Sequence, residues 1–252
     1  MTIMLADDPT AAAVLAAIPC YPVPPCGGSP ALDALRGARA SHGLAIGNDG
    51  AMLILRRPWL ELDVPVAPPM SFYLPYGSIG NPSARLRCGL IPGEHLNSIL
   101  DHFRAALPNE AAAFVLWNEK SREFALNLPE IDEASPTRLV YRMPVPGPDW
   151  HVVCDIHSHG TGRAFFSATD DSDDAGATKI SLVIGRFDHP DGPVMASRLC
   201  AGGLFLPLPR NPFQGDHPCS LIPAIATFFL QPSTAARSAS CLSDAAETER
   251  RC

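Results

Sequence analysis

The sequence lacks an excess of basic residues and any closely paired cysteines. Lys and Arg number 19 against 26 Asp and Glu, which gives a formal net charge of −7. Because nucleic-acid binders neutralise phosphates with a basic surface, we expect no direct contact with nucleic acid. None of the eight cysteines forms a C-x-x-C pair, which excludes a zinc ribbon, a zinc finger and a thioredoxin-like motif. We interpret the cysteines as reduced thiols and predict a cytoplasmic protein.

Apolar runs long enough to cross a membrane are also missing. The run LIPAIATFFL at 221–230 has about half of the roughly twenty residues that a bilayer requires, and it contains Pro223. The run AAAVLAAI at 11–18 follows Asp7 and Asp8, whereas a secretory signal carries positive charge at that place. We therefore expect neither export nor a membrane partner.

The composition that remains is that of a globular protein rich in strands. Apolar residues make up 46% of the 252 residues and charged residues 18%, which is enough to bury a core. The 27 prolines and 19 glycines favour short strands and long connections over a helix bundle. We predict an N-terminal arm and Pro-rich linker over 1–30, a small β-rich domain over 31–91, a second domain over 92–215 and a disordered tail over 216–252.

Periodicity predicts the elements within these segments. Two apolar runs flank Asn48-Asp49-Gly50, which indicates a β-hairpin. Apolar residues recur at helical spacing between residues 95 and 107, and this helix ends at Pro108. We expect a second helix to start at Ser167. Strands are expected at 111–117, 123–128, 137–143, 150–160, 179–187, 194–200 and 203–208.

Three residues between 157 and 170 form a candidate metal site. His157 and His159 are two residues apart at the end of a predicted strand, so both imidazoles can reach one ion from the same face. Asp170 lies a loop and one helical turn further on and can supply an oxygen as the third ligand. Three protein ligands and an open fourth position for water are typical of catalytic zinc, and we expect one Zn²⁺ per chain.

A hydrolase also needs a group that moves protons and a donor for the oxyanion. Glu110, between the predicted helix and the next strand, is the candidate general acid and base, with Glu119 as the alternative. Ser167 offers a hydroxyl three residues before Asp170. Each of these features also has a purely structural interpretation. Ser167-x-x-Asp170 can be only a helix capping box, and a lone HxH can be a pair of core or surface histidines. Glu110 can be a solvated carboxylate in a turn.

The segment HSHGTGRAFFSATD at 157–170 resembles the JAMM motif of the JAB/MPN-plus metalloproteases, H-[ST]-H-P-x6-S-x2-D, and the PNE at 108–110 resembles the upstream glutamate of that family. The likeness extends over about 92–210 in the order of elements. It implies an α/β fold of the JAB/MPN kind, with a cytidine-deaminase-like layout and a mixed sheet flanked by helices. It also implies zinc on His157, His159 and Asp170, proton transfer by Glu110 and oxyanion stabilisation by Ser167.

The chain departs from the family pattern at two places. Gly160 stands where the motif has proline, and Ala112 and Ala113 stand where the family often has glycine. The N-terminal extension and Pro-rich approach are most similar to a member of the PRTRC cassette, a plasmid-borne bacterial group with ParB-related and ThiF-related proteins. The resemblance implies a ubiquitin-like or sulfur-carrier-like protein as substrate and a ThiF-related activating enzyme as a partner. Because Gly160 and Gly162 flank the site, we also expect a narrow groove open to a substrate backbone.

Other interpretations fit the sequence less well. An amidohydrolase barrel needs more chain than remains beyond residue 159, and the motifs of zinc deaminases and HExxH proteases are absent. The rival is a non-catalytic MPN scaffold that binds the same partner, but a complete ligand set favours an enzyme. We expect Cys154 in the core and no metal on the acidic run Asp171, Asp173 and Asp174, which should be a solvated face. The remaining histidines of interest, His151, His189 and His217, are expected to be ordinary core or surface residues.

Overall fold

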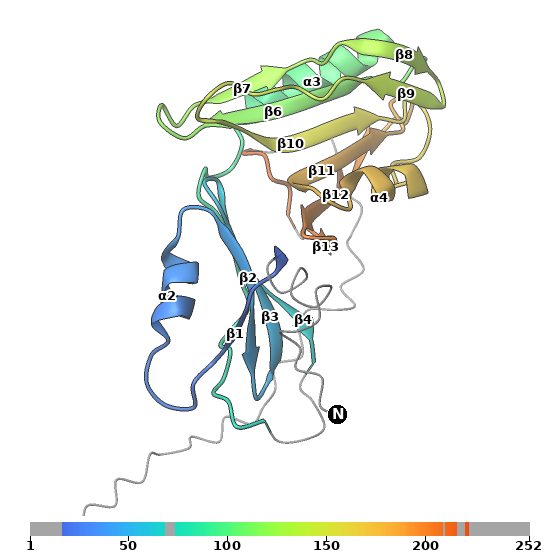
Figure 1. Ribbon diagram of the computed structural model, residues 1–252. Coiled ribbons are helices and arrows are strands. Elements are labelled where there is room, and N and C mark those ends of the chain that lie inside the picture. The colour runs from blue at the N-terminus through green and yellow to red at the C-terminus, as the bar shows by residue number, and fades with distance from the viewer. Residues whose placement is uncertain (1–16, 69–73, 209, 216–219, 222–252) are drawn as a thin grey trace, which may run out of the picture.

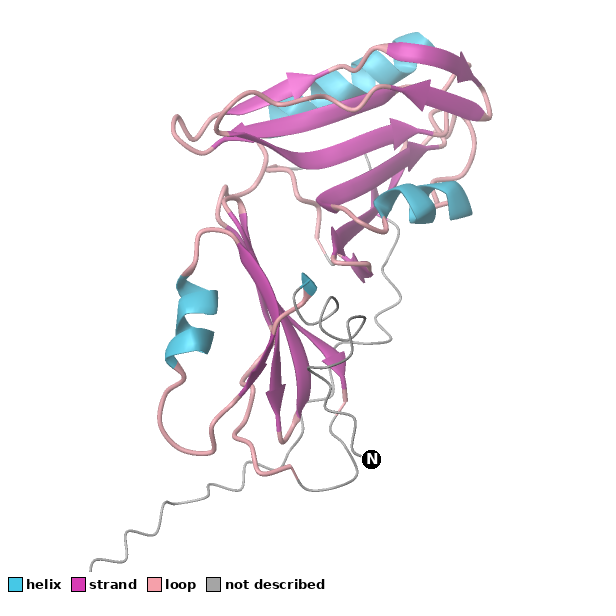
Figure 2. Cartoon of the chain, in the orientation of Figure 1, coloured by secondary structure: helices cyan, strands magenta, loops and turns pink. Residues whose placement is uncertain are grey.

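The computed structural model describes residues 17–68, 74–208, 210–215 and 220–221. Within these residues the chain forms a five-stranded sheet, then a seven-stranded sheet, with a separate two-stranded sheet beside the second (Figure 1). Strands far outnumber helices (Figure 2), in agreement with the high proline and glycine content. None of the helices in the described ranges is long and apolar enough to cross a membrane.

The N-terminal sheet has the strand order β1-β2-β3-β4-β5. Its strands are β1 (Cys20–Pro22), β2 (Ser41–Gly47), β3 (Gly50–Arg57), β4 (Leu60–Ala67) and β5 (Ser83–Leu86). The predicted hairpin at 48–50 is confirmed as the turn between β2 and β3.

The segment 19–30, which we predicted as a linker, contains an element of its own. β1 runs parallel to β2 at the sheet edge, where proline in a strand is tolerated. The side chains of Tyr21 and Val23 pack against the small core under the helix α2 (Pro30–Gly37). Proline content alone therefore gave the wrong description of 20–22, because these apolar side chains bury themselves on the sheet.

The two faces of the N-terminal sheet have different neighbours. Met52 and Ile54 of β3 face α2. Leu53 and Leu55 point to the other side and belong to the same hydrophobic core as Ile91 and the second sheet. The two sheets therefore share one core.

The second sheet has the order β13-β12-β11-β10-β6-β7, with β14 also beside β12. Its strands are β6 (Ala112–Asn118), β7 (Phe124–Asn127), β10 (Trp150–Ser158), β11 (Thr178–Gly185), β12 (Val194–Ala201), β13 (Leu204–Pro207) and β14 (Ser220–Leu221). The helix α3 (Gly93–Ala106) buries Leu96, Ile99, Leu100 and Phe103 in the core of this sheet. This confirms the predicted helix, the strands of the sheet and its mixed, helix-flanked α/β character.

The strand predicted at 137–143 is present but pairs elsewhere. It forms β9 (Arg138–Tyr141), whose partner is β8 (Ile131–Ser135), and the two make the separate two-stranded sheet. The predicted tail at 216–252 lies outside the described residues except for β14.

The connection between β10 and β11 carries the candidate site. These two strands are parallel, so the chain must cross over between them, and it does so through the helix α4 (Ala168–Asp174). The crossover begins at the carboxyl end of β10. His159, Ser167 and Asp170 therefore all belong to the segment of the chain that connects β10 to β11.

Candidate metal centre

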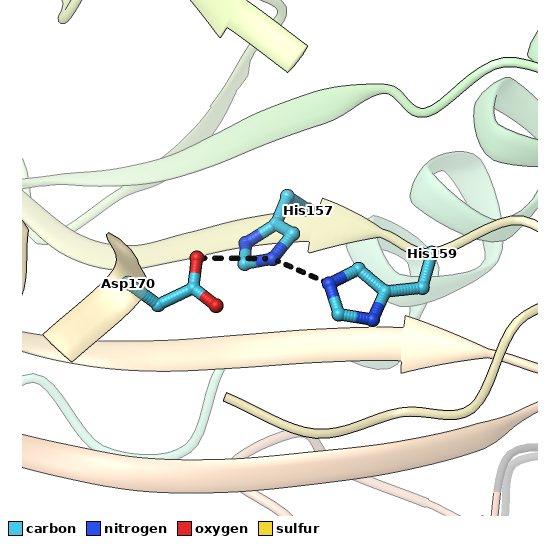
Figure 3. Close-up of side chains that lie close together, drawn as sticks. All are labelled: His157, His159 and Asp170. Atoms are coloured by element: carbon cyan, nitrogen blue, oxygen red, sulfur yellow. Dashed lines mark hydrogen bonds and ion pairs between the residues drawn. The ribbon is translucent and has the colours of Figure 1, made fainter. Parts of the chain in front are cut away.

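The two histidines of the motif lie side by side. His157 is the penultimate residue of β10, and His159 follows directly after the strand ends. Their Nε2 atoms are 3.3 Å apart (Figure 3). The two-residue spacing places both rings on one face, as strand alternation predicts.

Asp170 reaches the histidines from the first turn of α4. Its Oδ2 accepts hydrogen bonds from the backbone N of Ser167 at 2.6 Å and from the Ser167 hydroxyl at 2.7 Å. Its own backbone N donates to Ser167 Oγ at 3.2 Å, which completes a capping box. The other oxygen, Oδ1, lies 3.4 Å from His157 Nε2 (Figure 3). The cap therefore fixes the carboxylate through one oxygen and leaves the other beside the histidines, so the capping and ligand interpretations of Ser167-x-x-Asp170 are compatible.

Two of the three separations within this group match the ligand spacing around one zinc ion. With Zn–N bonds of about 2.0–2.1 Å, the edge of a ligand tetrahedron is about 3.3 Å. The observed separations are 3.3 Å between the imidazoles and 3.4 Å between His157 and Asp170. All three ligand atoms lie within 4.8 Å of one another, and no other group of this kind occurs in the described part of the chain.

The hydrogen-bond contact of His159 and the pKa of His157 both suit a metal ligand. His159 Nδ1 lies 2.9 Å from the carbonyl oxygen of Arg163, which can only accept, so this contact favours the tautomer with the proton on Nδ1 and the lone pair on Nε2. Burial lowers the pKa of His157 to about 4, against an opposing effect of the Asp170 carboxylate. His157 is therefore neutral near pH 7, as a metal ligand must be.

Gly160 explains why the motif proline is missing. Its φ is +52°, in the left-handed region, whereas proline is confined near −65°. After this turn the loop folds back on His159. Gly162 N donates to the His159 carbonyl at 2.7 Å, and the carbonyl oxygen of Arg163 contacts the His159 ring. A Cβ on Gly160 would lie 3.3 Å from the Pro108 carbonyl oxygen, and one on Gly162 would lie 2.9 Å from that of His159.

The backbone of the chain itself lies close to the positions that side chains at these two residues would take. The glycines therefore serve to shape the loop that holds His159. The groove that we predicted from them stays a prediction.

Glu110 lies beside His159, because the strands that these two residues adjoin, β6 and β10, are neighbours in the sheet. β6 and β10 are antiparallel with His157 opposite Ala112, and Ser158 N still donates to Ala111 O at 2.9 Å. One more step in that register places Glu110 opposite His159. Burial raises the pKa of the half-buried Glu110 carboxyl; the nearby His159 opposes this rise, and Asp170 adds to it.

The alternative base, Glu119, is not brought to the site. It lies at the other end of β6, where Arg39 holds its carboxylate and His151 Nε2 is 3.7 Å away. His157 is six positions further along β10 than His151, which corresponds to about 20 Å of strand. Of the two candidates only Glu110 is near the histidines.

The acidic run after Asp170 is not wholly solvated, contrary to expectation. Asp173 is exposed, but Asp174 is only 3% exposed and forms ion pairs with Lys179 at 2.8 Å and Arg198 at 2.7 Å. Burial acts to raise the pKa of Asp174, but the hydrogen bonds from these two cations outweigh it and keep the pKa below its ordinary value. The sequence signal that could have indicated this is a lysine and an arginine inside two otherwise apolar strands.

The other residues singled out from sequence have ordinary surroundings. Cys154 is fully buried in the hydrophobic core, as alternation in β10 predicted. His151 is partly buried at the start of β10, and His189 lies 3.7 Å from Asp191 in a surface turn. His217 lies outside the described residues.

Two family models match the chain, one in each of its two parts. Residues 92–199 match the family of prokaryotic homologs of the JAB domain, and this range contains all of the candidate site residues. Residues 8–87 match a domain of unknown function, DUF2016. The chain thus combines a JAB-like domain with a β-rich N-terminal region.

Comparisons with whole proteins add little to this. No curated protein matches the chain. Among solved structures, the solution structure of protein DSY2949 from Desulfitobacterium hafniense is 18% identical, covers 54% of this chain and 94% of its own, and has a TM-score of 0.37.

Proposed function

We propose that this protein is a zinc-dependent hydrolase of peptide or isopeptide bonds, with one zinc per chain held by His157, His159 and Asp170. The observation that carries the proposal is the triangle of ligand atoms, with separations of 3.3 and 3.4 Å that match the edge of a zinc tetrahedron. The match to the JAB domain supports it, because that resemblance implies the same three ligands.

The residues around the ligands can carry the remaining chemistry. Zinc held there would polarise a carbonyl oxygen and acidify a water molecule. Glu110, with its raised pKa, would take the proton of the attacking water and deliver it to the leaving amine. Ser167 is our candidate donor to the developing oxyanion, a role in which its hydroxyl would turn away from Asp170 Oδ2.

Metal analysis of the purified protein tests the zinc site. The wild type should contain one zinc per chain, and His157→Ala should contain none. His151→Ala is the matched control, since it removes a histidine from the same strand outside the ligand set, and it should keep the metal. No zinc in the wild type, or unchanged zinc in His157→Ala, would refute the site.

The substrate that we propose is the C-terminal tail of a ubiquitin-like or sulfur-carrier-like protein, as in a PRTRC-type cassette with a ThiF-related activating enzyme. The support is the family resemblance and the JAB match. The test compares cleavage of such a partner fused at its C-terminus after a Gly-Gly tail with a Leu-Leu variant. Selective cleavage after Gly-Gly supports the assignment, and equal cleavage of both contradicts it. Bound zinc without turnover of either would favour the non-catalytic scaffold.

A further inference from the structure

The helix that carries Asp170 is held to the sheet by charge. α4 has seven residues, too few for a helix that is stable on its own in water. Its single buried residue is Asp174, while its alanine and threonine are exposed. An apolar stripe, which normally docks a helix, is therefore absent from α4. The helix depends on the contacts of its carboxylates.

Arg198 of β12 makes the largest set of these contacts. Its Nη2 and Nε donate to Asp174 Oδ2 at 2.7 and 3.2 Å, and its Nη1 donates to Asp171 Oδ1. The guanidinium carbon also lies 3.9 Å from the ring centroid of Phe166 and 4.0 Å from that of Phe205. Arg198 therefore contacts the chain on both sides of the N-cap residue Ser167, through Phe166 before it and through the two carboxylates after it.

A second cation connects this cluster to the strand of the histidines. Lys179 of β11 donates to Asp174 Oδ1 at 2.8 Å and to Asp155 Oδ2. Asp155 lies on β10 two residues before His157, on the same face of the strand. Burial acts to lower the pKa of Lys179, but the two carboxylates outweigh it and raise the pKa, so the lysine stays charged. Buried ion pairs thus run from β10 through β11 and α4 to β12.

The capping box does not fix the position of α4 relative to the sheet, as these ion pairs do. Ser167 and Asp170 belong to the same turn, so their hydrogen bonds fix the carboxylate only relative to α4. The 3.4 Å separation between Asp170 Oδ1 and His157 Nε2 joins α4 to β10, and it depends on where the helix lies against the sheet.

We propose that Arg198 is a positioning residue of the metal site, which holds α4 so that Asp170 completes the ligand set with His157. The proposal rests on the proposed zinc site but not on hydrolysis. Arg198 acts through Asp170, and a residue that merely stabilised the fold would not depend on that ligand.

Zinc dissociation constants, measured by competition with a chelating dye, test this role. Arg198→Lys keeps the charge but loses the forked contact with both carboxylates, and it should weaken zinc binding about tenfold. Asp171→Asn, at a side chain that is 51% exposed, removes one of the contacts and should weaken binding in the same direction. The matched control is Arg85→Lys, an arginine–carboxylate pair on the N-terminal sheet, which should bind like the wild type.

A double-mutant cycle separates positioning from general destabilisation. The Asp170→Ala background keeps both histidines, so its weaker zinc binding is measured by titration with excess zinc rather than from the metal content of the purified protein. In this background the Arg198→Lys substitution should change zinc affinity by less than about twofold, because the ligand that it positions is gone. Circular dichroism of the metal-free proteins checks folding, and if Arg198→Lys does not fold, Asp171→Asn is carried through the same cycle.

Each outcome decides the proposal. A tenfold loss that disappears without Asp170 supports it. Wild-type affinity in the folded variants, or a loss that persists in the Asp170→Ala background, overturns it. A wild type without zinc overturns this inference and the proposed function together, whereas bound zinc with the expected cycle but no hydrolysis overturns only the proposed function.

Discussion

Restoring the motif proline at position 160 should damage this protein. The φ of Gly160 is +52°, and an L-residue with a Cβ costs about 1–2 kcal/mol in the left-handed region. Gly160→Ala should therefore lower the free energy of unfolding by about that amount, with a further small effect from the 3.3 Å approach to the Pro108 carbonyl. Gly160→Asn should lose less, since asparagine tolerates this conformation.

Proline cannot adopt this φ at all, so Gly160→Pro must rearrange the loop. Two hydrogen bonds would be lost, from Phe187 N to the Gly160 carbonyl at 3.2 Å and from His159 Nδ1 to Arg163 O at 2.9 Å. At about 1 kcal/mol each, these hydrogen bonds alone give an expected loss of about 2 kcal/mol, to which the rearrangement of the loop adds. Zinc affinity should fall as well, because the His159 ring loses the carbonyl that orients it.

Urea unfolding of the metal-free variants, followed by zinc titration, measures both effects. Gly176→Ala is the control: its φ is not positive and an added Cβ meets nothing within 4 Å. It should stay within about 0.5 kcal/mol of the wild type. If Gly160→Pro keeps the wild-type free energy of unfolding and its zinc, the explanation of the missing proline is wrong.

Three further results are expected. Glu110→Gln should keep zinc and fold but lose hydrolysis, because the amide cannot accept a proton. Glu119→Gln, the control, should keep zinc and hydrolysis. Turnover by Glu110→Gln would contradict the assignment. In urea unfolding of the metal-free proteins, the free energy of unfolding of the wild type should fall by about 2 kcal/mol more between pH 7 and pH 5 than that of His157→Gln. The pKa of buried His157 is lowered to about 4, so the unfolded chain binds the extra proton, and stability present above about pH 6.5 is lost as the pH falls toward 4. Ser167→Ala should lower the free energy of unfolding by about 1 kcal/mol through loss of the cap, and an unchanged value would show that the capping box is not stabilising.

Local spacing in the sequence was enough to predict that His157, His159 and Asp170 lie close together. The interval of two between His157 and His159 determines that both point to one face of a strand. The interval of three between Ser167 and Asp170 determines a capping box, which also orients the carboxylate. Contacts of this kind depend on the geometry of a single strand or a single turn, and the residues that make them are neighbours in the chain.

Pairings between distant segments could not be predicted in this way. β1 lies in a proline-rich stretch and forms because its apolar side chains meet the core under α2. β9 pairs with the unpredicted β8, a mostly exposed strand whose sequence has no apolar alternation. The choice between Glu110 and Glu119 follows from the register of β6 on β10, which sequence periodicity does not set.

The acidic run shows the same division most clearly. From the sequence alone, Asp171, Asp173 and Asp174 form one hydrophilic stretch, and Lys179 and Arg198 are isolated charges in apolar strands. Only the packing of α4 on β11 and β12 brings Asp174 to those cations, where the loss of water is compensated by ion pairs. The sequence by itself therefore determined which side chains form the candidate ligand set, because that information is local. The tertiary structure decided what holds them together, because compensation of buried charge requires groups that lie far apart in the chain.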